Sequence, residues 1–401
     1  MTLGNFLKSY GYLVFYGFVL AFLSSFGQTF LISLYVPDIQ AYFEVSDGLF
    51  SSFYAAATLG SAFTITWAGR FIDKKRLTRF TVIVMLGLAV ALIVLSQAYF
   101  IPLLILGLYG VRLFGQGLLT HTSITSMARF FSANRGKAIS LASLGHPGGE
   151  ALLPIIVVTL IGFLGWRMAL LVSAAFVLLA IPFVIRLLMR NKRFSHLRMF
   201  IPQLSTDSED IKASKPLTIL RSKAFWAIAP SNFASASIGT AIIFFQLKLG
   251  ETRGWSPTWI AASFVAYAIG GALSTLIAGW LTDRFNGRVL FPIYLLPFSL
   301  GLIVLYFFDG EWVYTFLVAA IGITNGYGNT VKNSALAEIW GTKIIGSVRS
   351  LFTTTMVFST ALGPVVFGVL LDAGITFNQL VIGSLVLMLA ISLNALRVMR
   401  L

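Results

Sequence analysis

Residues 69–76 read GRFIDKKR, and residues 279–288, which begin 210 positions later, read GWLTDRFNGR. The same offset holds in two further stretches. It pairs Gly136, Ser140 and Leu141 with Gly346, Ser350 and Leu351, and Ala151, Leu152 and Pro154 with Ala361, Leu362 and Pro364. One register that persists over separate stretches without a gap indicates two like-oriented halves related by duplication.

The composition shows in which solvent these halves fold. Of the 401 residues, 57% are hydrophobic and 11% are charged, whereas a soluble globular domain carries about 25% charged residues. This chain has too little polar surface to cover a water-soluble body, so we predict that it folds in lipid. A duplicated and strongly apolar chain is typical of two-lobed transporters.

The apolar runs predict an all-α membrane protein with twelve transmembrane helices in two pseudo-symmetric six-helix bundles. Each run is long enough to cross a hydrocarbon core of roughly 30 Å. The runs of the N-terminal bundle (1–188) lie near 11–36, 48–69, 78–98, 102–128, 138–164 and 168–188. Those of the C-terminal bundle (224–401) lie near 224–247, 257–281, 289–308, 312–336, 346–371 and 376–397. A middle loop, 189–223, joins the bundles.

The distribution of charge predicts the orientation. The net charge is +15, and most of the 29 Lys and Arg residues fall in the termini, the middle loop and alternate inter-helix loops, whereas the opposite loops hold Arg167, Lys248 and Arg253. Basic loops face the cytoplasm, so we place both termini and residues 189–223 on the cytoplasmic side of the inner membrane. The bilayer accounts for the basic composition, and we expect no nucleic-acid partner. The middle loop is either a linker along the headgroups or a regulatory docking segment.

Several classes of function are disfavoured by what the sequence lacks. The chain has no cysteine and three histidines, so we predict no metal site, no cofactor and no enzymatic activity. No charged or carbonyl-lined filter sequence is visible, which argues against an ion channel. The first ten residues lead directly into an apolar run without a small-residue cleavage site, so we interpret them as the start of a membrane helix, not a signal peptide.

The two basic loops resemble the loop signature of the major facilitator superfamily, in which Gly, three residues and Asp precede further basic residues. Gly69 and Asp73 carry the pattern in the first copy, and Asp283 and Arg284 carry it in the second. The first copy departs from it at Arg76, where the family usually has a second Gly. The resemblance implies that Asp73 faces helix 11 and Asp283 faces helix 5, as latches between the bundles. Alternatively, these loops only set the topology.

Helix 4 contains Arg112 within RLFGQG, which resembles the Arg-containing motif of the family's fourth helix. Arg112 lies roughly 15 Å from the outer end of the helix, close to the membrane midplane. An isolated charge at this depth costs several kcal/mol, so it must face a partner or a wet cavity. We predict that Arg112 binds substrate. A structural arginine bonded to helix-end carbonyls is the alternative.

Helix 5 contains GHPGGE at residues 145–150, a Gly/Pro-rich run with partial resemblance to the family's fifth-helix motif. His146 and Glu150 are four residues apart and share one helix face. An apolar environment favours the neutral form of a carboxylic acid, and a nearby guanidinium favours the charged form. A Glu150 opposite Arg112 would therefore change its protonation when substrate occupies the arginine. We assign proton coupling to Glu150 and His146; a permanent Arg112–Glu150 salt bridge is the alternative.

Polar residues in other helices are weaker candidates for the lining of a substrate cavity. Helix 10 carries Asn325, Asn329 and Asn333 at helical spacing, and this stripe either lines the cavity or bonds a neighbouring helix. Lys332 lies near the inner end and is expected to extend to the interface, which leaves Arg112 as the only central cation. The remaining candidates are Gln28 in helix 1, Tyr54 in helix 2, and Asn232 and Gln246 in helix 7.

Further stretches resemble the monocarboxylate-porter and oxalate/formate-exchanger branch of the superfamily. They are GWR at 165–167, FFQ at 244–246, RGWS at 253–256 and ALGP at 361–364. That branch commonly binds carboxylates with a basic residue inside helix 8 or helix 11. Here helix 8 has no charge, and helix 11 has only Arg349 at its inner edge.

These features predict a secondary active transporter that moves a small organic solute, with organic anions among the candidates, across the cytoplasmic membrane by alternating access. Arg112 would anchor the solute, and proton symport through Glu150 would drive it. We expect a functional monomer whose partners are the solute, protons and the lipid bilayer. The alternative is a drug/proton antiporter that exports lipophilic compounds.

Overall fold

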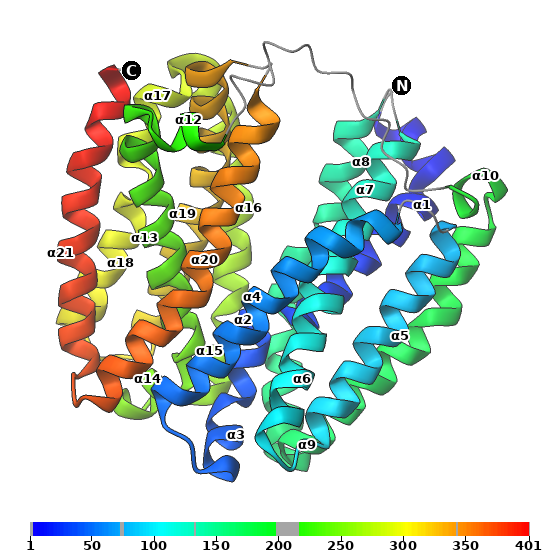
Figure 1. Cartoon of the computed structure of the whole chain (residues 1–401), viewed down its shortest axis with the longest axis horizontal. Coiled ribbons are helices and arrows are strands. Elements are labelled where there is room, and N and C mark those ends of the chain that lie inside the picture. Colours follow the sequence, from blue (N-terminus) through cyan, green and yellow to red (C-terminus); the bar gives the residue numbers. More distant parts are fainter. Residues whose placement is uncertain (1–2, 73–75, 132–133, 198–215, 342–343, 401) are drawn as a thin grey trace. The chain divides into compact units, whose positions relative to one another are not determined.

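The computed structural model describes residues 3–72, 76–131, 134–197, 216–341 and 344–400, except for the side chains of Leu3, 66–72 and Pro216. These residues are almost entirely helical (Figure 1). Helices suit a lipid solvent, because each backbone N–H and C=O finds its partner inside the helix itself. The chain divides into two compact units. Unit 1 comprises Met1–Val45 and Phe53–Pro202, and unit 2 comprises Ser46–Ser52 and Gln203–Leu401.

Unit 1 contains the elements of the first six predicted spans. They are α1 (Leu3–Leu23), η1 (Ser24–Gly27), α2 (Thr29–Ile32), η2 (Ser33–Tyr35), α3 (Val36–Phe43), most of α4 (Asp47–Ile72), α5 (Leu77–Ser96), α6 (Ile101–Val111), η3 (Arg112–Leu119), α7 (Thr120–Phe130), α8 (Arg135–Ser143), α9 (Gly145–Met189) and α10 (Lys192–Ser195). In this unit α9 packs against α1 and α5, and α5 packs against α6.

Unit 2 contains the elements of the last six predicted spans. They are α12 (Pro216–Leu220), α13 (Lys223–Phe244), α14 (Gln246–Arg253), α15 (Pro257–Ala262), α16 (Phe264–Phe285), α17 (Gly287–Leu290), η4 (Phe291–Ile293), α18 (Leu296–Phe307), α19 (Trp312–Trp340), α20 (Ile345–Asp372), α21 (Phe377–Ala395) and η5 (Leu396–Arg400). Within it α16 and α18 pack against α19, and α13 packs against α20.

The helices account for the twelve predicted spans. Ten helical stretches of the described chain are long and apolar enough to cross a bilayer. One of them, Arg135–Met189, contains two predicted spans, because Gly165 inside α9 leaves helical geometry (φ 76°, ψ 162°). Polar residues make α19 less apolar than these ten stretches, but its 29 residues are long enough to cross the bilayer. The predicted all-α fold with twelve membrane helices is confirmed.

Small residues let the helices of unit 2 approach closely. The α16–α19 contact runs along Gly322 and Gly326. A Cβ atom at these positions would lie 2.2 Å from the carbonyl oxygen of Tyr267 and 2.1 Å from that of Gly271. Lipid supplies no hydrophobic drive between helices, so close backbone packing of this kind provides much of their attraction.

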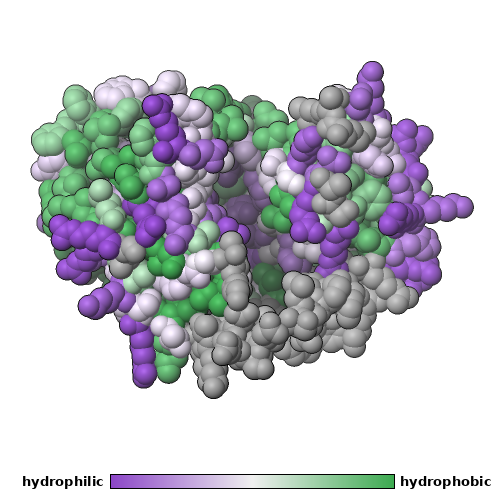
Figure 2. Space-filling model, turned by 90° about the horizontal axis from the view of Figure 1, so that it is seen from above, coloured by the Kyte–Doolittle hydropathy of each residue, from purple (hydrophilic) through white to green (hydrophobic). Residues whose placement is uncertain are grey.

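The exterior of both units is apolar where it faces lipid. Phe163, Leu179 and Leu276 are 84%, 77% and 73% exposed, which is suited to acyl chains and not to water. Figure 2 shows one end of the molecule, at which hydrophilic residues gather on each unit. α10, with exposed Lys192 and Arg193, lies at this end (Figure 1). Of the predicted middle loop, residues 198–215 lie outside the described chain.

Candidate functional site

The predicted span 11–36 is not one continuous helix. After α1, Ser24–Gly27 form a 3-10 turn, Gln28 is extended (φ −84°, ψ 152°), and α2 begins at Thr29. The hydroxyl of Ser24 donates to the carbonyl of Ala21 at 2.7 Å, and serine competes with helical hydrogen bonds in this way. Irregular backbone at membrane depth persists only where protein buries it or where it lines a water-filled cavity. The backbone groups at this break therefore need partners from the surrounding protein or from water.

The fourth helix changes from α-helical to the wider π-helical geometry opposite this break. α6 continues into a π-helix, η3, before α7 restores α-helical geometry. Gly27 and Gly115 lie in backbone contact here. A Cβ on Gly27 would lie 2.2 Å from the carbonyl oxygen of Val111, and one on Gly115 would lie 2.7 Å from the nitrogen of Gly27. Only glycine fits this crossing, and π-helical turns are frequent at functional sites.

Arg112 lies at this crossing and is 2% exposed. Its Nη1 donates to the carbonyl oxygen of Gly27 at 3.2 Å and to Oγ1 of Thr29 at 3.5 Å. The guanidinium carbon is 5.1 Å from the centre of the Tyr54 ring, whose hydroxyl lies 2.7 Å from Oγ1 of Thr29. These partners are neutral, and Nε of Arg112 has no hydrogen-bond partner among the described residues. The guanidinium is positioned, but no residue that the structure describes forms an ion pair with it.

The fifth helix approaches the same break from α9. Gly145 and Gly149, one turn apart, bring α9 close to α1, and a Cβ on Gly149 would lie 2.1 Å from Oγ of Ser25. Nδ1 of His146 lies 3.3 Å from Oγ of Ser24. The first helix is therefore flanked at its break by helix 4 on one side and helix 5 on another.

Glu150, which follows Gly149, is partly buried and has no hydrogen bond or ion pair with any residue that the structure describes. The direct contact between Arg112 and Glu150 that the sequence suggested is not formed. Arg112 instead uses the carbonyl of Gly27, which the helix break sets free. The two charged residues lie on separate helices that both contact the broken segment.

Other predicted and unpredicted residues complete this site. Tyr54, a predicted candidate, lies against the guanidinium of Arg112, and Gln28, another, lies partly buried at the break itself. Thr29 and Ser25 were not singled out by sequence reasoning. Oγ of Ser25 is buried without a hydrogen-bond partner in the described chain. The run of small polar residues in an apolar segment (SSFGQT, 24–29) was the available signal.

In unit 2, two of the predicted candidates are occupied by bonds to neighbouring helices. Oε1 of the fully buried Gln246 accepts from the hydroxyl of Tyr314 at 2.6 Å. Nδ2 of Asn325 donates to the hydroxyl of Tyr267 at 3.0 Å. These bonds fix α14 and α16 against α19, so both side chains have a bracing role in this structure.

Lys332 corrects an expectation from the sequence, because its side chain does not extend to the interface. It is partly buried inside unit 2, where Nζ donates to Oδ1 of Asn232 at 2.8 Å and to Oδ1 of Asn329 at 3.5 Å. Asn232 in turn donates Nδ2 to the carbonyl oxygen of Phe352 at 3.4 Å. Arg112 is therefore not the only cation inside the membrane region.

The predicted latch residues are described only in part. Asp73 lies outside the described residues, and Gly69 belongs to the helical backbone of α4. Asp283 and Arg284 are exposed at the end of α16, where the guanidinium of Arg284 lies 5.3 Å from the ring centre of Phe285. Contacts that would latch one unit to the other remain predictions.

Sequence reasoning missed the residue that organises the second loop. The carboxylate of Glu338 accepts from the backbone N–H groups of Gly287 at 2.6 Å and Arg288 at 3.1 Å, and from the hydroxyl of Ser334 at 2.8 Å. These bonds tie the end of α19 to the turn between α16 and α17. Its position in an otherwise apolar helix end gave no indication of this role.

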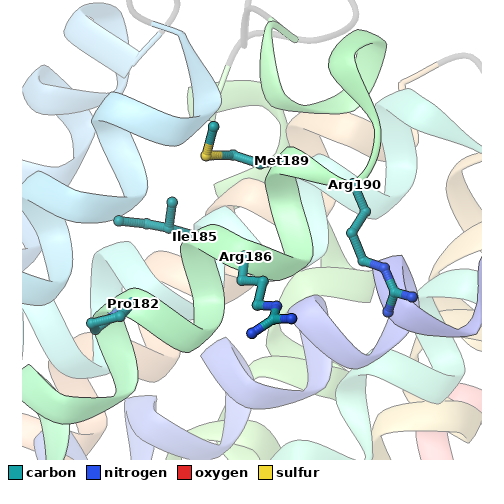
Figure 3. A pocket seen from close by; sticks show the side chains of 5 residues that line it. All are labelled: Pro182, Ile185, Arg186, Met189 and Arg190. Carbon is teal, nitrogen blue, oxygen red and sulfur yellow. The ribbon is translucent and has the colours of Figure 1, made fainter.

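A separate groove of about 590 Å³ lies along the C-terminal end of α9 (Figure 3). It is lined by Pro182, Ile185, Arg186, Met189 and Arg190, which share one side of a single helix. No predicted site residue lines it. Its apolar wall and arginines suit the boundary between acyl chains and headgroups, so it is distinct from the site around Arg112.

Comparisons with known proteins agree with this architecture. The model of the Major Facilitator Superfamily matches residues 17–262 and 229–400. The chain is 26% identical to human monocarboxylate transporter 11, over 90% of this chain and 78% of that protein. It is 27% identical to the glycerol-3-phosphate transporter of Bacillus subtilis (strain 168), over 40% of this chain and 39% of that protein.

Among solved structures, a bacterial homolog to the human lysosomal transporter Spinster, in an inward-facing and unoccupied conformation, has a TM-score of 0.74. It shares 15% sequence identity, with 97% of both chains covered, and thus shows the fold alone. The family match extends over nearly the whole chain. The chain belongs to the Major Facilitator Superfamily, and it is a multi-pass membrane transporter, not an enzyme.

Proposed function

We propose that this member of the superfamily, a secondary transporter, carries a small organic anion across the cytoplasmic membrane together with protons, with both termini in the cytoplasm. Arg112 anchors the anion, and Glu150 carries the proton. The observation on which the proposal rests is that Arg112, buried inside unit 1, has no counter-ion among the described residues.

The surroundings of Arg112 favour an anionic ligand over a structural role alone. A cation at membrane depth costs several kcal/mol unless it is solvated or paired. Carbonyl, hydroxyl and ring partners orient the guanidinium without cancelling its charge. The free Nε belongs to the planar fork that binds carboxylate or phosphate in a bidentate manner. An anion would supply both the missing hydrogen bond and the missing charge.

The names of two curated relatives support the same class of substrate. One is a monocarboxylate transporter and the other is a glycerol-3-phosphate transporter, so both names denote small organic anions. A drug/proton antiporter for lipophilic cations would be poorly served by a buried guanidinium, because like charges repel strongly at low dielectric.

Glu150 supports proton coupling through its lack of a fixed partner. A carboxylate locked in an ion pair must break that pair before it accepts a proton. Glu150 has no such pair among the described residues and lies next to Gly149, which contacts the broken first helix. No partner in the described chain therefore holds Glu150 in its charged form. His146, bonded to Ser24 in the same segment, is the adjacent relay candidate.

Uptake by proteoliposomes with an imposed pH gradient tests the proposal. The probes are lactate, succinate and glycerol 3-phosphate as anions, and tetraphenylphosphonium as a lipophilic cation. We expect saturable, proton-driven uptake of at least one anion. Arg112→Gln should reduce it about 10- to 100-fold, which corresponds to the loss of a charged hydrogen bond.

The matched control is Arg186→Gln, which removes an exposed arginine from the groove on α9. It should leave uptake within about twofold, because surface charges contribute little. Transport of the lipophilic cation alone, or anion uptake that survives Arg112→Gln unchanged, would refute the proposal.

A further inference from the structure

The groove along the C-terminal end of α9 combines an apolar wall with two cations. Pro182, Ile185 and Met189 form the wall, and Arg186 and Arg190 line the groove beside them. The two arginines are four residues apart, so they lie on successive turns of one helix face. Figure 3 shows both guanidinium groups pointing in the same direction. One ligand can therefore meet both cations and the wall at once.

The length of the helix indicates how deep these residues lie in the bilayer. The second half of α9 begins at Trp166, directly after the bend at Gly165. Tryptophan is enriched at the boundary between membrane and water. Arg186 follows 20 residues later, which is roughly 30 Å along the axis and equals the thickness of the hydrocarbon core. This length sets Arg186 and Arg190 at headgroup level on the other side of the bilayer, with Pro182 one turn deeper, among acyl chains.

Neither arginine has a counter-ion among the residues that the structure describes. Arg190 contacts the neutral ring of Tyr12 on α1, with 5.3 Å between the guanidinium carbon and the ring centre. Arg186 is exposed and forms no hydrogen bond within the described chain. The described acids of unit 1 lie elsewhere: Glu150 precedes the bend of α9, and Asp38 and Glu44 belong to α3 and its C-terminal cap. In Figure 1, α3 lies at the opposite end of unit 1 from α10, which follows Arg190.

The wall favours a lipid over a water-soluble anion. Its apolar side chains continue into Leu179 and Phe183, which are 77% and 47% exposed. A soluble anion would pair with the guanidinium groups and leave this surface uncovered, whereas an acyl chain would cover it. The planar guanidinium binds phosphate oxygens in a bidentate manner. Exposed Lys192 and Arg193 on α10 add to the positive potential, and basic pockets beside membrane helices attract anionic headgroups.

We infer that this groove binds one anionic phospholipid, a ligand that the proposed function does not include. The phosphodiester group lies between Arg186 and Arg190, and one acyl chain follows Ile185 and Pro182 along α9. In the orientation proposed above, the lipid belongs to the cytoplasmic leaflet. It covers the surface of unit 1 and is separate from the site around Arg112, so the test measures lipid binding and not uptake.

Lipid binding to the full-length protein in detergent micelles, measured by native mass spectrometry, tests this inference. Phosphatidylglycerol should bind about 10-fold more tightly than phosphatidylcholine with the same acyl chains, because the headgroup of phosphatidylcholine is zwitterionic. Arg186→Gln combined with Arg190→Gln should lower the affinity for phosphatidylglycerol about 10-fold and leave that for phosphatidylcholine within about twofold. Arg186→Lys combined with Arg190→Lys keeps both charges without the planar forks, so its affinity should fall between the two.

The matched control removes the same amount of charge from another part of the chain. Arg397→Gln combined with Arg400→Gln changes two exposed arginines of η5 in unit 2. This variant should bind phosphatidylglycerol as the wild type does, within about twofold. An equal loss of affinity in both pairs of variants would show that the lipid responds only to net charge. That result, or no loss in the α9 variant, would overturn the inference.

Glycerophosphoglycerol, the headgroup without acyl chains, distinguishes a lipid from a soluble phosphate ester. It should bind about 10-fold more weakly than phosphatidylglycerol, because the apolar wall then has no partner. Ile185→Asn, which keeps both arginines, should weaken the binding of phosphatidylglycerol about 3- to 10-fold and leave that of glycerophosphoglycerol unchanged. If the headgroup alone binds as tightly as the lipid, or if Ile185→Asn leaves lipid affinity unchanged, the groove is not a lipid site.

Discussion

Gly27 and Gly115 cross backbone to backbone, at the point where the first helix breaks and the fourth becomes a π-helix. The crossing brings Arg112, three residues before Gly115, within hydrogen-bond distance of the carbonyl of Gly27. The broken helix and the buried cation are therefore one structural unit. A change to either glycine should disturb both.

Gly115→Ala should lower both stability and transport. The added methyl group would lie 2.7 Å from the nitrogen and 2.8 Å from Cα of Gly27, and rigid backbone cannot yield cheaply. Overpacking of this kind costs about 1–3 kcal/mol, which should appear as a lower melting temperature in detergent. Gly162→Ala on α9, where a Cβ meets nothing within 4 Å, is the control. Equal melting temperatures for the two variants would show that the crossing tolerates a side chain.

Glu150→Gln should uncouple transport from protons without destroying the substrate site. The amide keeps the shape of the side chain but cannot take up or release a proton. Proteoliposomes should therefore lose accumulation driven by a pH gradient and retain exchange of substrate across the membrane at equal pH. Glu251→Gln, at an exposed position of α14, serves as the matched acid-to-amide control. Unchanged proton-driven accumulation in Glu150→Gln would assign coupling to another group.

Glu338→Gln should weaken the turn between α16 and α17. The amide can accept at only one of its two terminal atoms, so one of the backbone donors at Gly287 and Arg288 loses its partner. The expected loss is about 1–3 kcal/mol for a charge-assisted bond. Limited proteolysis at this turn should be faster than in the Ser334→Ala variant, which removes a neutral bond only. Identical proteolysis rates would argue against a dominant role of the carboxylate.

Arg167→Lys should destabilise unit 1 while leaving substrate affinity intact. The guanidinium of Arg167 lies 4.3–4.6 Å from the ring centres of Trp166, Tyr42 and Tyr99, and it donates to the carbonyls of Ser96 and Ala98. Lysine keeps the charge but loses the planar fork.

Cation–aromatic contacts contribute about 0.5–2 kcal/mol each, so the melting temperature of Arg167→Lys should fall clearly. The comparison variant is Arg190→Lys, since Arg190 has one ring contact, with Tyr12 at 5.3 Å. Its melting temperature should change less. A shift in KM for Arg167→Lys would instead connect this cluster with the substrate.

Much of the fold followed from the sequence because its determinants are local and repeated. Span lengths, the 210-residue register and the spacing of basic loops each constrain the chain without knowledge of tertiary contacts. Arg112 stood out for the same reason, since a charge in an apolar run is costly wherever it points. The two basic loops carry the resemblance to the family in a few contiguous residues each.

The parts that sequence reasoning missed depend on direction and on partners. Lys332 was expected to extend to the interface because its distance from the helix end permits it, and only the asparagine on α13 shows that it turns inward. The break at Gly27 escaped notice because no proline marks it. The break is in backbone contact with Gly115, 88 residues away in the chain, and periodicity cannot reveal such a contact.

At its break the first helix presents a free main-chain carbonyl oxygen, that of Gly27. The corresponding helix of the second half has no such break. The residue 210 positions after Gly27 is Ser237, and α13 passes through it as an unbroken helix. A carbonyl oxygen of the backbone is the same in every amino acid, so no single codon change can remove it. A substitution at Gly27 or Gly115 can displace this oxygen but cannot change its chemistry.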